Sequence, residues 1–207
     1  MLSKRIEQMV KMGLLAALSI ILVFLIHFPI FPAAQHLEFD IANVPILIGT
    51  FMFGPIAGLC LTAVVSMLQW LLISPQSGWV GAVMHFCATG GLVLVAGLIY
   101  RAHKTRKGAV VALILGSLTL IALMVPLNYF FTVRFWGTPY EVVDSMMLPV
   151  IIPFNAIKAF GNAAITFLLY KSAAKVLRIE RKSEEKPEAT DSAGEEQNRE
   201  ADAWNHD

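Results

Sequence analysis

Charged residues are scarce in this sequence. Asp, Glu, Lys and Arg make up 15% of the 207 residues, whereas 57% are hydrophobic and the mean hydropathy is +0.65. An average soluble domain is about 25% charged and less apolar than this. The net charge is +1, and no basic face exists outside the segments that flank the apolar runs, which argues against a nucleic-acid partner. The composition indicates an integral membrane protein that lies in a lipid bilayer.

Motifs for chemistry are also lacking. The sequence has no G-x-x-x-x-G-K-[ST] phosphate loop, no H-E-x-x-H metal motif and no paired intramembrane carboxylates for a proton relay. The two cysteines, Cys60 and Cys87, fall in apolar segments and are predicted to be reduced packing residues. We therefore predict no catalytic residue, no metal site and no cofactor. No energy source is visible in the sequence.

Apolar runs predict about six membrane spans. They cover residues 12–28, 45–53, 57–73, 79–100, 109–131 and 154–170. Pro126 is predicted to interrupt the fifth span, and Pro153 to lie in the first turn of the last one, where a missing N–H is no loss. The first run lacks a cleavage site and is read as a retained helix. The fold class is thus an all-α integral membrane protein with a six-helix bundle over residues 1–178 and an acidic, disordered cytoplasmic tail over 179–207.

Positive charge sets the expected topology. Lys and Arg gather at the N-terminus, in the turn at 101–107 and after residue 170, so both termini are expected in the cytoplasm. The polar segments 33–43 and 134–145 then lie together on the outer face. Asn128, Asn155 and Lys158 fall on the same side, so we expect a pocket that opens outward.

Asn155 and Lys158 are the most informative polar residues. A Lys inside a spanning helix costs about 2.5 to 3.5 kcal/mol, and such a residue usually faces a cavity, a partner or a substrate path. The two lie three positions apart, so they share one helix face. The alternative is that Lys158 extends to the nearer interface while Asn155 caps backbone groups. Asn128 could likewise serve only as a helix–helix hydrogen bond.

Other polar and small residues have weaker signals. Asp40 and Glu38 could be solvated loop acids, or caps before the helix that follows, and a structural role is favoured for Asp40. His85 is expected to be a hydrogen-bonded core residue. Trp70, Trp79 and Trp136 are expected to be interface anchors or pocket walls. Gly13 and Ala17, four positions apart in the first span, permit close approach of a partner helix.

Three strings resemble a known family: DIANVP at residues 40–45, LIGTFMFGPIAG at 47–58 and IPFNAIK at 152–158. They are similar to the substrate-binding S components of energy-coupling factor (ECF) vitamin transporters, most closely the riboflavin-specific type. The resemblance runs from the first helix to residue 170. It implies a six-helix protein of the bacterial plasma membrane that captures a vitamin outside. A transmembrane coupling subunit and two ATPases would complete the transporter.

The resemblance also implies site residues. In riboflavin-specific members the ligand is held at positions that correspond to Asn155, Lys158, Asn128 and the neighbourhood of Leu37, and Asp40 is included as a candidate. Gly13 and Ala17 correspond to the face that meets the coupling subunit.

Two departures from the family pattern, Ser66-Met67 and His85-Phe86, leave the ligand open. Riboflavin is expected, with pantothenate, folate or another metabolite as the alternative on the same fold. A small intramembrane enzyme or an assembly protein is the least favoured alternative.

Overall fold

The computed structural model describes residues 4–31 and 37–184. The chain divides into two units, Met1–Leu169 and Tyr170–Asp207, which are treated separately here. The described part of the second unit is the end of one helix. Most of the predicted acidic tail, from residue 185 onward, lies outside the described residues.

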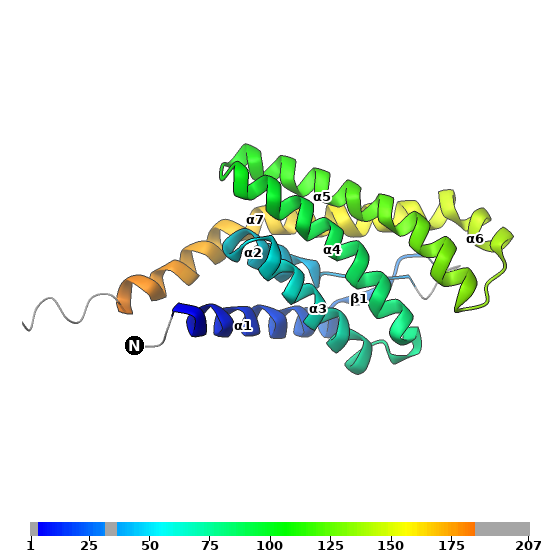
Figure 1. Cartoon of the computed structure of the whole chain (residues 1–207), viewed down its shortest axis with the longest axis horizontal. Helices are drawn as coiled ribbons and strands as arrows, with labels where there is room; N and C mark the ends of the chain where they lie inside the picture. Colours follow the sequence, from blue (N-terminus) through cyan, green and yellow to red (C-terminus); the bar gives the residue numbers. More distant parts are fainter. Residues whose placement is uncertain (1–3, 32–36, 185–207) are drawn as a thin grey trace, which may run out of the picture. The chain divides into compact units, whose positions relative to one another are not determined.

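Helices dominate the described chain (Figure 1). They are α1 (Lys4–Leu25), α2 (Asn43–Phe53), α3 (Pro55–Leu72), α4 (Gly78–Ala102), α5 (Arg106–Leu127), α6 (Tyr140–Met146) and α7 (Ile152–Glu184). Three shorter turns join them, namely the 3₁₀ turn η1 (Pro75–Ser77) and the π-helical turns η2 (Asn128–Thr132) and η3 (Met147–Ile151). Two strands, β1 (His27–Pro29) and β2 (Glu38–Asp40), complete the structure.

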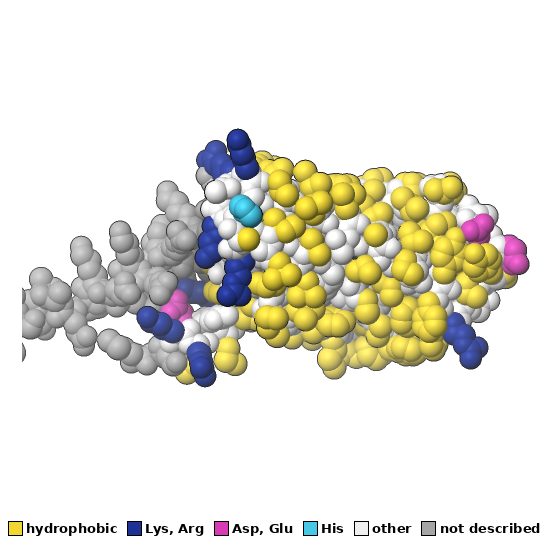
Figure 2. All heavy atoms as spheres, turned by 45° about the horizontal axis from the view of Figure 1, so that its top comes forward, with side chains coloured by type: hydrophobic (Ala, Val, Ile, Leu, Met, Phe, Trp, Pro, Cys, Tyr) yellow, Lys and Arg dark blue, Asp and Glu magenta, His cyan; other side chains and the backbone are white. Residues whose placement is uncertain are grey.

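Five helical segments are long and apolar enough to cross a membrane. They are Lys4–Leu25, Pro55–Leu72, Gly78–Ala102, Arg106–Thr132 and Tyr140–Tyr170, and Asn43–Phe53 is a shorter apolar helix. Many large apolar side chains on these helices are exposed, and Figure 2 shows apolar atoms spread over the middle of the visible face with most of the visible Lys and Arg at one end. An apolar outer surface of this kind suits contact with lipid rather than water. The predicted class of a mostly helical membrane protein is confirmed.

The first predicted span is wrong at its outer end. Helix α1 stops at Leu25, and the next residues form β1, which pairs antiparallel with β2 so that His27 lies opposite Asp40 and Pro29 opposite Glu38. Pro29 cannot continue a helix because it lacks an N–H. Strands of three residues are too short to show a period in sequence, so the β1–β2 ribbon was not predicted.

The start of the last span is also wrong. Helical structure begins at Tyr140, directly after Pro139, and passes through η3 into α7 without a break, so Pro153 does not begin the helix. Similarly, Pro126 does not interrupt the fifth span, which continues through η2 to Thr132. In both helices a π-helical turn lies beside the prolines. A π turn lets a helix absorb a local break in its hydrogen bonding, which is why these segments stay helical.

A glycine-mediated crossing holds α2 and α3 against α4. Gly54 joins α2 to α3 with a φ of 99°, a conformation that only glycine adopts readily. A Cβ added at Gly97 on α4 would lie 2.8 Å from Pro55 Cβ and 2.8 Å from Thr50 Cγ2. The backbones therefore approach closely because position 97 has no side chain.

Both cysteines are free thiols in apolar helices. Cys60 and Cys87 are exposed. They lie on the outer faces of α3 and α4, since a helix presents only part of its circumference to the core.

Candidate functional site: a cavity beneath the ribbon

A cavity of about 770 Å³ lies between the β1–β2 ribbon and helices α2 to α5 and α7. Pockets for small organic ligands have volumes of about 300 to 1,000 Å³. Leu37, Asp40, Asn128, Asn155 and Lys158, the five residues predicted to bind substrate, all line this cavity. The structure thus gathers residues that are as far apart in sequence as 37 and 158. Their role in binding remains a prediction.

One side of the cavity is apolar. Leu37, Val143, Met147, Ile151 and Phe154 form a buried cluster, and four of the five lie on or beside the helical segment that begins at Tyr140. Leu37, Val143, Ile151 and Phe154 line the cavity. This side can pack against the flat or aliphatic part of a ligand.

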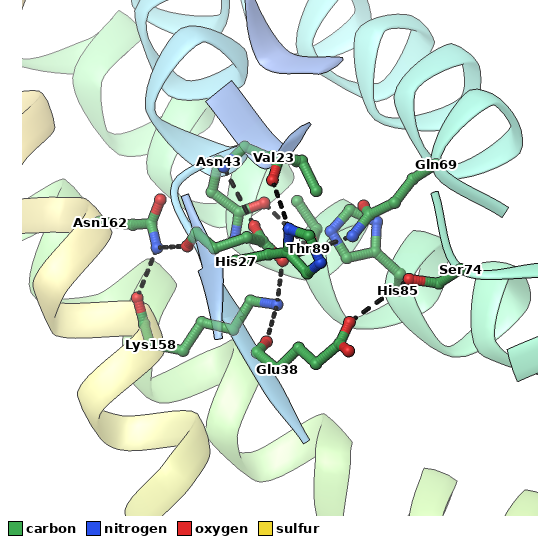
Figure 3. A network of polar contacts seen from close by, with 12 residues as sticks. Val23, His27, Glu38, Asn43, Gln69, Ser74, His85, Thr89, Lys158 and Asn162 are labelled. Atoms are coloured by element: carbon green, nitrogen blue, oxygen red, sulfur yellow. Dashed lines mark hydrogen bonds and ion pairs between the residues drawn. The ribbon is translucent and has the colours of Figure 1, made fainter. Parts of the chain in front are cut away.

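Lys158 is held inside the protein by Asp40. Its Nζ lies 2.6 Å from Asp40 Oδ2 and donates a second hydrogen bond to the carbonyl oxygen of Glu38 at 3.2 Å (Figure 3). Asp40 is only 1% exposed, so the alternative of a solvated loop acid is wrong. The Lys158 side chain is 14% exposed, which rules out an extended position at the interface.

Asp40 is ionised despite its burial. Burial alone would raise the pKa of Asp40, but the Lys158 ammonium and the backbone N–H of Ala42 lower it below its ordinary value. That N–H donates to Asp40 Oδ1 at 3.0 Å. The structural role favoured for Asp40 and its position at the cavity therefore coexist: it turns the backbone after β2 and it neutralises Lys158.

Hydrogen bonds from three parts of the chain anchor the ribbon and the residues that follow it. Asn162 on α7 donates to the carbonyl oxygen of Asp40 at 2.9 Å, and Ser74, after α3, donates to Glu38 Oε2 at 3.4 Å. Ser19 on α1 donates to the carbonyl oxygen of Ala42 at 3.1 Å. Figure 3 shows Lys158 and Asn162 reaching the ribbon from one side while Gln69 and Ser74 approach from the other. The ribbon is thus fixed as one wall of the cavity.

Asn155 and Asn128 bond to their own helices. Asn155 Nδ2 donates to the carbonyl oxygen of Ile151, and Asn128 Nδ2 to that of Met124, each at 2.8 Å. Asn128 is the first residue of η2, and Asn155 follows η3 in α7, so each amide donates back one turn along its own helical segment. Asn155 and Lys158 share a helix face as predicted, but within the described residues no hydrogen bond joins them.

Several further polar residues, which sequence patterns do not assign to a site, line the cavity. Ser66, Gln69 and His85 line it, as do Asn43 and Thr89. His85 is hydrogen-bonded as expected, with Nδ1 2.7 Å from Ser66 Oγ, yet it lies at the cavity rather than in a closed core. Isolated polar residues in apolar helices carry no spacing signal, so only the fold reveals that they converge.

Three of the four tryptophans lie in the described residues, and they separate into two groups. Trp70 and Trp136 line the cavity. Trp79 is 47% exposed and packs edge-on against Phe135, with ring centroids 5.1 Å apart. Trp79 therefore fits the interface-anchor prediction, whereas Trp70 and Trp136 fit the pocket-wall prediction.

Gly13 and Ala17 lie on an open face of α1. Both are exposed, and no atom lies within 4 Å of a Cβ built at Gly13. Within the described structure this face is free for another helix, but a docking role stays a prediction.

Comparison with known proteins identifies the family. Residues 7–170 match the family described as "ECF transporter, substrate-specific component". The chain is 29% identical over 178 residues to the riboflavin transporter RibU of Staphylococcus aureus, covering 83% of this chain and 93% of that one. It is 26% identical to the riboflavin transporter FmnP of Bacillus subtilis over 174 residues, which cover 80% of this chain and 91% of the relative.

A solved structure agrees with these matches. The S component of a bacterial ECF transporter superposes with a TM-score of 0.72 at 29% identity, covering 84% of this chain and 99% of that one. The match over nearly the whole bundle, together with the apolar helices, shows that this chain belongs to the family of ECF transporter substrate-specific components, transport proteins that pass several times through the bacterial plasma membrane.

Proposed function

We propose that this chain captures riboflavin at the outer face of the membrane and delivers it inward. Its named relatives in Staphylococcus aureus and Bacillus subtilis are riboflavin transporters. The observation that carries the proposal is the cavity, because it combines an apolar side with Asn128, Asn155 and Lys158. Riboflavin likewise combines a flat ring system with a polyhydroxylated ribityl chain.

The geometry suggests how the ligand is held. The ring system packs on the apolar side beside Leu37 and Phe154, where its burial supplies most of the binding free energy. Asn128, Asn155 and Lys158 hydrogen-bond the ribityl hydroxyls. The Nζ of Lys158 can donate three hydrogen bonds, of which Asp40 and Glu38 take two, so one remains for the ligand.

Transport needs partners that supply energy. We propose that a transmembrane coupling subunit and two ATPases associate with this chain, the general mode of its family. The docking face is the open side of α1 at Gly13 and Ala17, where small residues permit close helix packing.

The proposed topology has six spans with both termini in the cytoplasm. It counts α2 as the sixth span beside the five longer segments. The basic residues at the start of α1 and in the α4–α5 turn support this orientation. Residues 1–178 would then form the binding domain and 179–207 a cytoplasmic tail.

The first test is the visible absorbance spectrum of the detergent-purified protein. A retained flavin gives a yellow protein, and added riboflavin loses fluorescence on binding. Asn155→Ala should weaken this binding while leaving the thermal stability near wild type, because Asn155 bonds only to its own helix among the described residues. Exposed Cys87→Ala is the matched control and should change neither property.

The second candidate function is transport of a different ligand on the same fold, and one observation supports it. Ser66 and His85, where the family pattern is not followed, both line the cavity. If the purified protein is colourless and does not quench added riboflavin, the riboflavin proposal fails. Pantothenate or folate, tested by the shift in melting temperature on addition, would then be the next ligand to examine.

A further inference from the structure

The wall formed by α3 and α4 holds polar groups that the proposed function leaves unused. Gln69 and His85 line the cavity, but Gln69 Oε1 and His85 Nε2 are both buried and have no hydrogen-bond partner among the described residues. Buried polar atoms in folded proteins nearly always have a partner, so each orphan calls for an explanation. Asn128 belongs to η2, and Asn155 and Lys158 belong to α7, so this wall is a separate group.

Hydrogen bonds fix the orientation of both side chains. Gln69 lies 3.4 Å from Asp40 Oδ2, and an ionised carboxylate only accepts, so the amide nitrogen of Gln69 must face Asp40. The Gln69 oxygen is then the atom left free. This oxygen is an acceptor.

The His85 ring is oriented in the same way. Its Nδ1 lies 2.7 Å from Ser66 Oγ, which has no other hydrogen-bond partner within the described chain. When the Ser66 hydroxyl donates to Nδ1, the single proton of the neutral imidazole resides on Nε2. His85 therefore offers a donor where Gln69 offers an acceptor.

We propose that Gln69 and His85 form a second polar subsite, which binds the edge of a cyclic imide or amide ring. Such an edge carries an N–H beside a carbonyl oxygen, so the N–H donates to Gln69 Oε1 and the carbonyl accepts from His85 Nε2. Both orphan atoms gain a partner only when the ligand is bound. This inference rests on the proposed function, and it specifies how the site reads the ring of its ligand.

The chemistry of riboflavin fits this division into two subsites. Its pyrimidine ring presents an imide N–H between two carbonyl oxygens, at a different part of the molecule from the ribityl chain. Apolar residues that line the same cavity, among them Trp70, Met84 and Leu120, suit the aromatic rings between the two polar parts. A site that hydrogen-bonds a ligand group discriminates strongly against analogues that lack it, because its polar atoms then stay unpaired.

The test compares riboflavin with 3-methylriboflavin, whose imide N–H is replaced by a methyl group. Fluorescence quenching on the wild-type protein should give a Kd at least about tenfold higher for the methylated ligand, the factor that one lost hydrogen bond produces. This comparison needs no variant and does not depend on whether a variant folds. Equal affinities, within about twofold, would overturn the inference.

Two variants then assign the effect to these residues. Gln69→Leu should raise the Kd for riboflavin about tenfold but the Kd for 3-methylriboflavin by less than about threefold, since the methylated ligand has already lost its hydrogen bond to Gln69. His85→Phe should raise the Kd for both ligands about tenfold, since the methylated ring keeps the carbonyl that accepts from His85. His85→Gln, which keeps a donor, should recover part of the affinity. Cys87→Ala, on the exposed side of α4, is the control for both ligands. An equal loss for both ligands in Gln69→Leu, or no loss for riboflavin in His85→Phe, would overturn the assignment of these residues.

Lumichrome, which keeps the rings but lacks the ribityl chain, separates this subsite from the first. His85→Phe should still weaken lumichrome binding, whereas Asn155→Ala should not. If Asn155→Ala weakens lumichrome binding and His85→Phe does not, the assignment of the ring edge to Gln69 and His85 is wrong. A wild-type protein that binds no flavin overturns the proposed function and this inference together, while flavin binding without discrimination at the imide overturns the inference alone.

Discussion

The Asp40–Lys158 ion pair makes a quantitative prediction through the variant Asp40→Asn. Asparagine keeps the size of the side chain and an oxygen that can accept from the N–H of Ala42, so the change removes little but the negative charge. Lys158 would then remain inside the protein without a counter-ion, beside the carbonyl oxygen of Glu38.

The expected cost follows from the burial of the pair. Removing one partner of a buried ion pair costs about 3 to 5 kcal/mol, because the other charge stays desolvated and uncompensated. The Asp40 side chain is 2% exposed and that of Lys158 is 14% exposed, so some water reaches the lysine and the lower end applies. A loss of about 3 kcal/mol in a protein of this size lowers the Tm by about 6 to 12 °C.

Thermal unfolding of the purified protein in one detergent measures this directly. Glu141→Gln, which removes an exposed acid on α6, is the control and should leave the Tm within about 2 °C of wild type. The double variant Asp40→Asn/Lys158→Met should recover much of the lost stability, since no charge is then left buried alone. If Asp40→Asn melts within about 2 °C of wild type, the reasoning from a desolvated pair is refuted.

Three further predictions concern other parts of the chain. Because the pKa of Asp40 is lowered on folding, its contribution to stability is fully present above about pH 4 and is lost as the pH falls through the folded-state pKa. The Tm difference between wild type and Asp40→Asn should therefore stay constant from pH 5 to 8 and shrink only in stronger acid. A Tm difference that shrinks as the pH is raised would contradict this prediction. Gly97→Leu should lower the Tm by several degrees, since the new side chain would collide with Pro55 and Thr50 at the helix crossing. An unchanged Tm would show that α4 can move away from α2 and α3 without loss of stability. Gly13→Leu should leave flavin binding unchanged but weaken co-purification with the coupling subunit, whereas loss of ligand binding would show that position 13 supports the bundle instead.

Much of the bundle could be predicted because lipid imposes strict rules on sequence. A span must be apolar over a fixed length, and this located α2 to α5 within a few residues of their bounds, whereas α1 begins earlier and ends earlier than predicted. The errors occurred where proline was read as an end. Pro126 and Pro153 lie inside helical segments because π-helical turns beside them accommodate the missing N–H groups, and the presence of such a turn depends on the packing around it.

Some residues of the site could likewise be predicted from the sequence, whereas others could not. Lys158, Asn155 and Asn128 stood out because a polar side chain in an apolar run has a free-energy cost that a cavity can offset. The sequence could not show that Lys158 is neutralised by Asp40, since 118 positions separate them, nor that Gln69 and His85 face the same cavity.

The sequence by itself therefore determined the membrane class, the approximate spans and the polar residues worth examining, because the solvation of each residue is a local property. Only the tertiary structure decided which of these residues meet. The pairing of β1 with β2 brings Asp40 over α7, and the crossing at Gly97 brings α3 alongside α4. Contacts between distant segments depend on how whole helices pack, and that packing is a property of the complete bundle.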